Sequence, residues 1–391
     1  MNKNVWLLFC CQALMNAIMS GQTIMASLTG HNLSGSALNT LPMAIQMVSV
    51  MGASVLASQV FSRFGRKPGF WLGSSISFCG SLTFAAGIYV HSFPLYCLGA
   101  IPAGLGFGIA QHLRFAAAEV ADADSKARAI SLVLAGGVLA AIVGPEMVKR
   151  TNDLIPDYQF LATYLYLPVL PMITCTLLWF VELPPAPPRV VVPIPFAAII
   201  ARPNFVAAVC ASLAGYASMN LIMVSTPLQM VLCGFTVGAT ADVIRSHSVS
   251  MYAPGFFTGR LIQKFGVHQI IGIGSLITLT CVAMNLYFPP EWGVFMVSLA
   301  LLGLGWNFMF VGGTTMLTTA YSANERVRVQ ATHDFIVFGS VACTALGSGV
   351  LESMAGWTAL NLTVVPPVVI AMGVVAWHYV AKRRVVAAEI A

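Results

Sequence analysis

Runs of about 20 predominantly apolar residues recur along almost the whole chain, and they constrain its fold more than any other feature. Each run is long enough to cross about 30 Å of hydrocarbon as an α-helix. In lipid, every backbone amide must find a partner within the protein, so such runs are expected to be helical. Only 8% of the 391 residues are charged, against roughly 25% in soluble domains. The sequence therefore predicts an all-α membrane protein.

We predict twelve transmembrane helices. They cover residues 5–28, 38–62, 69–90, 93–118, 128–148, 160–181, 204–229, 239–259, 269–288, 293–320, 329–352 and 358–381. The first run lacks a small-x-small cleavage site and is taken as a span. If the N-terminus is cytoplasmic, the loops on that side hold all of the 19 Lys and Arg residues except Arg114, Lys149, Arg150 and Arg245. The positive-inside rule then places both termini in the cytoplasm.

The predicted spans fall into two similar halves. Residues 1–181 form an N-terminal six-helix half, residues 182–203 a proline-rich cytoplasmic linker, and residues 204–391 a C-terminal six-helix half with a basic tail. The sequence Arg-Phe-Gly begins at Arg63 after the second span, and Lys-Phe-Gly begins at Lys264 after the eighth, 201 residues later. A parallel repeat of two six-span halves is typical of secondary transporters.

The loop after the second span carries a recognisable motif. Residues 58–67 read Ser-Gln-Val-Phe-Ser-Arg-Phe-Gly-Arg-Lys, which resembles the loop Gly-x-Leu-x-Asp-Arg-x-Gly-Arg-Lys of the major facilitator superfamily. The basic half of the motif matches at Arg63, Gly65, Arg66 and Lys67, while serines occupy the Gly and Asp positions. The resemblance implies the major facilitator fold of two six-helix halves and transport by alternating access.

Methionines are paired on the predicted helices. The chain has 19 Met residues and four Met-x-x-x-Met pairs, where chance predicts roughly one pair at this same-face spacing. One pair is Met219 and Met223 in span 7, and span 8 contains His247 and Met251 at the same spacing. Because the two spans are antiparallel, Met223 is expected level with His247 and Met219 with Met251. Thioethers select Cu(I), and imidazole also suits copper, although Met also fills gaps between helices.

The two pairs together resemble the signature of the CcoA-type copper importers, which are major facilitator proteins. All four positions match: Met219, Met223, His247 and Met251. The resemblance implies that these residues bind copper and that the protein imports it into the cytoplasm for cytochrome oxidase assembly. It also implies a location in the bacterial inner membrane, with a copper chaperone or exporter acting downstream.

Ionisable residues lie inside two predicted spans, where burial is costly. Span 4 contains His112 and Arg114, and span 8 contains Asp242 and Arg245 at a spacing that allows an ion pair. One interpretation is proton coupling or gating, with His112 the best placed by depth. The other is structural pairing, together with snorkelling near the span ends.

Other classes of function fit less well. No phosphate-binding loop and no nucleophile–His–acid set is evident, so we predict no enzymatic activity and no cofactor. The net charge of +6 reflects membrane topology rather than nucleic-acid binding. An alternative is a transporter of an organic solute such as a siderophore, drug or metabolite, in which Trp306, Asn307 and Arg114 would be selective. A further alternative is a copper sensor or oxidase-assembly partner that does not transport.

Overall fold

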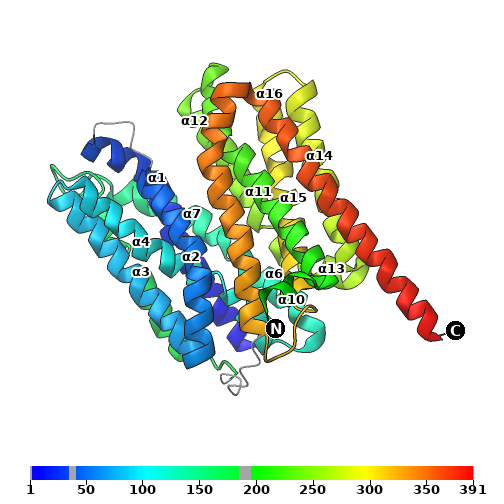
Figure 1. Ribbon diagram of the computed structural model, residues 1–391. Helices are drawn as coiled ribbons and strands as arrows, with labels where there is room; N and C mark the ends of the chain where they lie inside the picture. Colours follow the sequence, from blue (N-terminus) through cyan, green and yellow to red (C-terminus); the bar gives the residue numbers. More distant parts are fainter. Residues whose placement is uncertain (1, 35–40, 185–194, 391) are drawn as a thin grey trace. The chain divides into compact units, whose positions relative to one another are not determined.

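The computed structural model describes residues 2–34, 41–184 and 195–390. Within these ranges the chain forms α-helices and one short 3-10 turn, with no strand (Figure 1). It divides into two compact units, Met1–Arg189 and Val190–Ala391. Residues 185–194 of the predicted linker lie outside the described ranges. Each unit is considered by itself below.

The N-terminal unit consists of helices that match the first six predicted spans. They are α1 (Lys3–Ser34), α2 (Leu41–Phe64), α3 (Arg66–Tyr89), α4 (Phe93–Ala110), α5 (Leu113–Val120), the 3-10 turn η2 (Ala123–Ser125), α6 (Lys126–Ala135), α7 (Gly137–Thr151), α8 (Leu161–Tyr166) and α9 (Val169–Trp179). The polar end of α4 is capped, because the Ser92 side chain accepts a hydrogen bond from the Leu95 backbone N–H.

The C-terminal unit repeats this order. Its helices are α10 (Phe196–Ile200), α11 (Pro203–Leu232), α12 (Val237–Tyr252), α13 (Gly255–Phe265), α14 (Val267–Tyr287), α15 (Trp292–Leu317) and α16 (Arg326–Ile390). The long α16 holds the last two predicted spans, which meet where Gly356 leaves helical geometry with φ 75°. This left-handed conformation favours glycine.

Ten helices in the described residues are long and apolar enough to cross a membrane, two fewer than the predicted spans. The eighth span is interrupted between α12 and α13 at Pro254, because proline has no backbone N–H to donate to the preceding turn. It also carries the charged residues Asp242 and Arg245. The eleventh span forms the first part of α16, and the structure does not describe all of its side chains.

Corresponding helices pack in the same way in the two units. In the N-terminal unit α4 packs on α2 and α3, and in the C-terminal unit α15 packs on α12 and α14. Close contact between α15 and α12 depends on Gly303, because a Cβ there would lie 2.6 Å from the His247 carbonyl oxygen. At the matching position of α4, a Cβ on Gly104 would lie 2.3 Å from the Gln46 carbonyl oxygen. In both units, therefore, a glycine lets the backbones of two neighbouring helices meet directly at the corresponding position.

Candidate substrate-binding site

His247 is fully buried at the contact between α12 and α15. Its Nδ1–H donates to the Leu299 carbonyl oxygen over 2.8 Å, and since a carbonyl can only accept, Nδ1 carries the proton when the ring is neutral. The other nitrogen, Nε2, is then a lone-pair site, and it is buried without a hydrogen-bond partner among the described residues. Met251 lies one turn along the same face and is also buried.

Met219 and Met223 lie on α11, which packs mainly on α15 and α16 and only slightly on α12. Gly215 of α11 lies against Met309 of α15. Met219 is buried one turn further along the same face of α11. Its level along α15 is therefore within about one turn of Gly303. Met251 contacts Gly303, so Met219 and Met251 lie at similar levels along α15. Met223 is half-buried.

An aromatic cluster forms where α11, α12, α15 and α16 approach one another. Trp306 stacks on Phe310, with ring centroids 5.1 Å apart and planes at 20°. Tyr216 meets Trp306 edge-on at 5.4 Å, and Tyr252 does so at 5.7 Å. Phe338 of α16 completes the cluster against Tyr216, at 5.7 Å. The Trp306 indole N–H is buried and has no hydrogen-bond acceptor among the described residues.

Asn307, which follows Trp306, has a structural role in the contact between α15 and the eighth span. Its side-chain N–H donates to the Met251 carbonyl oxygen over 2.7 Å. Its side-chain oxygen accepts from the Thr258 hydroxyl over 2.6 Å. The residue therefore holds α12 and α13 against α15 across the interruption at Pro254.

The N-terminal unit buries a group of amide side chains that the sequence analysis did not single out. Asn16 Oδ1 accepts from Gln12 Nε2 at 2.8 Å and from Gln111 Nε2 at 3.3 Å. On the next turns, Gln22 Oε1 accepts from Gln46 Nε2 at 2.6 Å. Gln12 Oε1 and Gln22 Nε2 are buried without partners in the described part of the unit. Polar groups at membrane depth are costly, so they commonly mark a site of function.

His112 and Arg114 lie beside this group, where α4 gives way to α5. Both are buried. The Arg114 Nη1–H donates to the Gln111 carbonyl oxygen over 2.6 Å, and its guanidinium lies over the Phe115 ring. The His112 ring packs edge-on against Phe61 at 5.4 Å. Both residues therefore follow Gln111 closely in the chain, and His112 lies level with the last turn of α2.

Asp242 and Arg245 form the ion pair that their spacing allowed, at 3.1 Å. Both side chains are more than half exposed, so the pair does not form a buried relay within the C-terminal unit. A buried acid–imidazole contact occurs instead on α16, where His333 Nδ1 lies 2.8 Å from Asp334 Oδ1.

The loop motif is held by a charge pair that the sequence analysis did not anticipate. Gly65 has φ 87° between α2 and α3, and the following Arg66 is buried. The Arg66 guanidinium binds both carboxylate oxygens of Glu119, at 2.5 and 2.8 Å. Glu119 thus supplies the acid that is absent from the loop itself. Lys67 donates to backbone carbonyl oxygens at the end of α9, and Arg63 is exposed.

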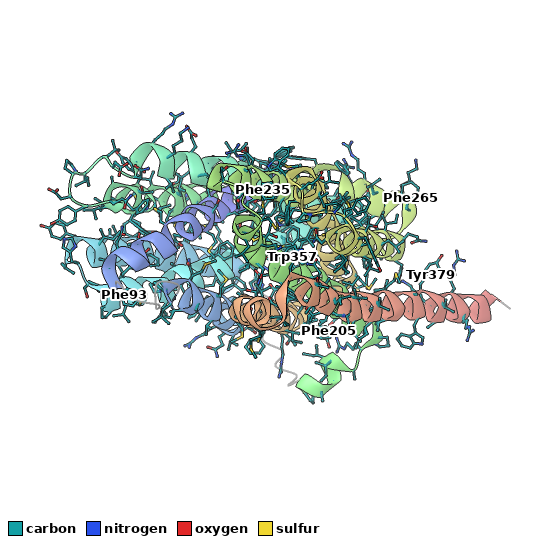
Figure 2. The ribbon with its side chains drawn as sticks, turned by 90° about the horizontal axis from the view of Figure 1, so that it is seen from above. Phe93, Phe205, Phe235, Phe265, Trp357 and Tyr379 are labelled. Carbon is teal, nitrogen blue, oxygen red and sulfur yellow. The ribbon has the colours of Figure 1, made fainter. Side chains whose placement is uncertain are left out.

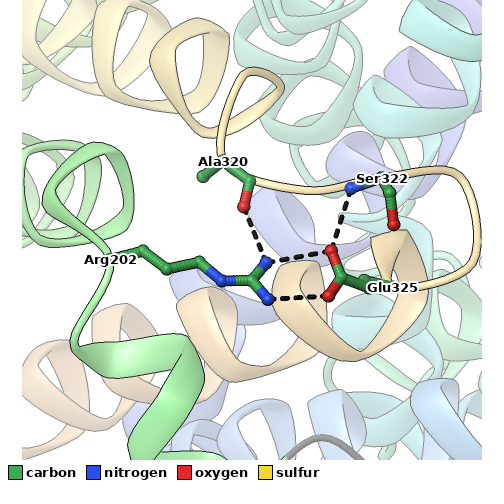
Figure 3. Close-up of polar contacts among 4 residues, drawn as sticks. All are labelled: Arg202, Ala320, Ser322 and Glu325. Carbon is green, nitrogen blue, oxygen red and sulfur yellow. Dashed lines mark hydrogen bonds and ion pairs between the residues drawn. The ribbon is translucent and has the colours of Figure 1, made fainter. Parts of the chain in front are cut away.

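The C-terminal unit has a charge pair of its own at the start of α11. Arg202 makes a bidentate contact with Glu325, at 2.6 and 2.9 Å, and also donates to the Ala320 carbonyl oxygen (Figure 3). Glu325 accepts in addition from the Ser322 backbone N–H. The Arg202 hydrogen bonds lower the pKa of Glu325 to about 2. This pair fixes the α15–α16 loop to the beginning of α11.

Comparison with known proteins gives the class. Residues 234–390 match the family model of the Major Facilitator Superfamily. The riboflavin transporter RfnT of Brucella anthropi is 35% identical over 375 residues, which covers 95% of this chain and 94% of that protein. The transporter YdeG of Bacillus subtilis, described as uncharacterized and MFS-type, is 25% identical over 88% of this chain and 84% of its own.

Solved structures show the same fold. The MFS transporter FucP in its outward conformation superposes with a TM-score of 0.76 at 13% identity, covering 95% of this chain and 97% of that one. A bacterial homologue of the iron transporter ferroportin, in its outward-facing state, superposes with a TM-score of 0.79 at 10% identity, covering 97% and 100%.

The fold and its relatives define a multi-pass membrane transporter of the secondary type, and not an enzyme. The chain belongs to the Major Facilitator Superfamily. The predicted fold class and superfamily are thus confirmed. Copper import, which the resemblance to CcoA-type proteins implied, finds no support among these relatives, and the four copper ligands stay a prediction. The inner-membrane location and the cytoplasmic termini also stay predictions.

Proposed function

We propose that this protein transports a planar organic solute of the flavin class across the membrane. The leading support is the 35% identity to a riboflavin transporter over almost the full length of both chains. That relationship favours the organic-solute alternative over copper. An isoalloxazine ring has two wide π faces and a polar edge of carbonyl, imine and N–H groups, and the proposal requires side chains suited to both features.

The aromatic cluster of the C-terminal unit suits the π faces. Stacking of a heteroaromatic ring on an aromatic side chain is worth roughly 1–3 kcal/mol, and aromatic-lined sites with few polar groups are typical of small-molecule binding. Tyr216 and Tyr252 offer partly exposed rings, and Trp306, buried behind them, offers an unused N–H donor. We assign this donor to a carbonyl oxygen of the solute.

Taken by itself, the amide group of the N-terminal unit offers hydrogen-bonding groups of the kind that the polar edge of a flavin requires. Amides offer donors and acceptors in one side chain, and they complement the alternating groups of an imide. Gln12 Oε1 is a buried acceptor and Gln22 Nε2 a buried donor, each without a partner in the described structure. A site that hydrogen-bonds a substrate strongly rejects analogues that lack the group, because its own polar atoms are then left unpaired.

The test is uptake of radiolabelled riboflavin into bacterial cells that lack a flavin importer. Cells that express the wild type should accumulate label, and the Trp306→Ala variant should accumulate about tenfold less, the loss expected for roughly 1.4 kcal/mol of stacking. Trp357→Ala is the matched control, since Trp357 lies in the same unit outside the cluster, where its ring packs against Phe295. Absence of uptake by the wild type would refute the proposal.

A second candidate substrate is Cu(I), favoured by the state of His247. Histidines that bind metals typically donate one ring N–H to a carbonyl or carboxylate, which fixes the other nitrogen as the ligand. His247 has this arrangement, with Nδ1–H on Leu299 and Nε2 buried and unpartnered among the described residues. Buried Met251 and Met219 lie at similar levels on neighbouring helices.

The same cells distinguish the two substrates when radioactive copper is supplied in place of riboflavin. If copper is the substrate, the Met223→Ala/His247→Ala double variant loses copper accumulation while Trp306→Ala keeps it. If a flavin is the substrate, copper accumulation equals that of cells carrying an empty vector. Met316→Leu is the control, because Met316 is buried on α15 outside the predicted ligand set.

A further inference from the structure

Two histidines form a hydrogen-bonded chain at one end of the C-terminal unit. His268 lies at the start of α14, and His378 lies 110 residues later in the final part of α16. His268 Nε2 is 2.9 Å from His378 Nδ1, and the rings stack at 22°. His378 Nε2 is 2.6 Å from Asn204 Oδ1 at the start of α11. Tyr379, which packs against His268, marks this end of α16 in Figure 2.

The direction of every bond in this chain is determined. Asn204 Nδ2 donates to the backbone oxygen and hydroxyl of Thr319, so Asn204 Oδ1 must face His378. An amide oxygen only accepts, and His378 Nε2 therefore carries a hydrogen. In the neutral ring Nδ1 is then the acceptor, and His268 Nε2–H donates to it. The side chains of His268, His378 and Asn204 and the Thr319 acceptors therefore form one continuous hydrogen-bonded chain while both imidazoles are neutral.

Protonation affects this chain in two distinct steps. A first proton on His378 Nδ1 is tolerated, because neutral His268 can move its hydrogen to Nδ1 and accept at Nε2. A second proton gives both rings N–H groups that face each other over 2.9 Å. No acceptor then lies between the rings, and two like charges oppose one another. The contact must break.

The surroundings of the pair are cationic. Lys382, one turn beyond His378 on α16, exerts its charge on both rings. Arg383 lies over the Tyr379 ring on the same helix, while on α11 the charge of Arg202 is matched by Glu325. Gln269 on α14 donates to the Tyr379 hydroxyl. In the described part of the unit, no carboxylate pairs with either imidazole to hold a second proton.

The N-terminal unit has a lysine, Lys67, at the position that corresponds to His268. Lys67 follows Gly65 by two residues, as His268 follows Gly266. The Lys67 ammonium donates to the Trp179 and Val181 carbonyl oxygens at the C-terminal end of α9, the final helix of its unit. A lysine side chain thus joins these helices in one unit, and a neutral imidazole pair joins them in the other.

We propose that His268, His378 and Asn204 form a proton-sensitive latch that joins α11, α14 and α16 in the C-terminal unit. The latch is closed while the pair carries at most one proton and opens when it carries two. Unperturbed histidine titrates near pH 6.5, and the second proton must enter against the charges of the first proton and of Lys382, so opening falls well below pH 6.5. The positive-inside prediction places these helix ends in the cytoplasm, where acidification would loosen this end of the transporter. The latch does not depend on the proposed substrate.

The test is hydrogen–deuterium exchange of the purified full-length protein at pH 7.5 and pH 4.0, corrected for intrinsic exchange. Peptides from the starts of α11 and α14 should exchange at least severalfold faster at pH 4.0 in the wild type. In His268→Gln/His378→Gln the amides can rebuild the neutral chain, because glutamine Nε2 and Oε1 offer the same donor and acceptor. This variant should show no pH-dependent rise.

Controls separate the latch from general acid sensitivity. His91→Gln, in the N-terminal unit, should behave as the wild type, and Asn204→Ala should exchange fast at both pH values. The single variant His268→Gln should also lose the pH response, because one remaining imidazole can take its proton without breaking the chain. A wild type without the rise, or glutamine variants that keep it, would overturn the proposal.

Discussion

At the scale of the residue, the Arg202–Glu325 pair links the stability of the C-terminal unit to pH. The Glu325 pKa falls from its ordinary 4.5 to about 2 because Arg202 donates to the carboxylate. A lowered pKa means that the stabilisation is complete above about pH 4.5 and is lost as pH falls towards 2. The pair is partly exposed, with side chains 29% and 18% accessible, so its contribution is about 1 kcal/mol.

Glu325→Gln should therefore lower the thermal unfolding temperature of the detergent-solubilised protein at pH 7, and the deficit should shrink to nothing near pH 2. The matched control is Glu146→Gln. Glu146 also pairs with an arginine, at 2.6 Å, but both side chains are largely exposed, so little change is expected. An equal deficit at every pH would show that the contribution of Glu325 is not electrostatic.

The amide group yields a second residue-scale prediction, which depends on the proposed flavin substrate. Gln12→Leu removes the unpaired acceptor Oε1 together with the donor to Asn16. Riboflavin uptake should fall about tenfold, as expected for the loss of a hydrogen bond of roughly 1.4 kcal/mol. Inhibition of wild-type uptake by a flavin methylated at the imide nitrogen should be weak. If that analogue competes as well as riboflavin, the amides do not recognise the imide edge.

At the scale of the element, α15 organises the C-terminal unit, because α11, α12 and α14 all pack along it. Its glycines differ sharply in what surrounds them. A Cβ on Gly303 would lie 2.6 Å from the His247 carbonyl oxygen and 2.9 Å from the Met251 nitrogen. A Cβ on Gly293, in the same helix, would meet no atom within 4 Å.

Gly303→Ala should consequently separate α12 from α15 and destabilise the protein by roughly 1–3 kcal/mol, the usual cost of overpacking. Gly293→Ala should stabilise it slightly, since alanine favours a helix over glycine by up to about 1 kcal/mol. Unfolding temperatures of the two variants beside the wild type provide the check. Equal behaviour of the two alanines would contradict the close contact between the helices.

The elements also show where prediction from sequence succeeds and where it ends. Apolar runs located the spans because lipid leaves a long apolar segment no alternative to a helix. The interruption before Pro254 and the pairing of Arg66 with Glu119 were missed. Pro254, inside the predicted eighth span, was a signal for the first, whereas the second joins residues 53 positions apart, which periodicity within one helix does not contain.

At the scale of the whole molecule, the two units can be compared as repeats. Asn2 donates to the Val120 carbonyl oxygen in the N-terminal unit, and Arg202 donates to the Ala320 carbonyl oxygen in the C-terminal unit. The donor and the acceptor of the second bond each lie 200 residues after those of the first. The repeat that the sequence indicated from one loop motif therefore extends to individual hydrogen bonds. The substrate could not be predicted in the same way, because paired methionines serve both metal binding and packing.

The predicted orientation is a property of the whole chain and can be tested directly. A green fluorescent protein fused after Ala391 should fluoresce, since it folds in the cytoplasm of bacteria. Alkaline phosphatase at the same position should stay inactive. The positive-inside distribution of charge is the reason. Active phosphatase with dark fluorescent protein would place the C-terminus on the opposite side of the membrane.

The contact between a glycine and the facing backbone, present in both units, also bears on how the two halves evolved. Gln46 and His247 are 201 residues apart and occupy the same position against Gly104 and Gly303. If the units descend from one duplicated gene, a single ancestral side chain has diverged into an amide in one copy and an imidazole in the other. The glycine supports either, because it meets only their backbone. Such a contact lets selection alter the chemistry of one half of a symmetric protein while its architecture is left unchanged.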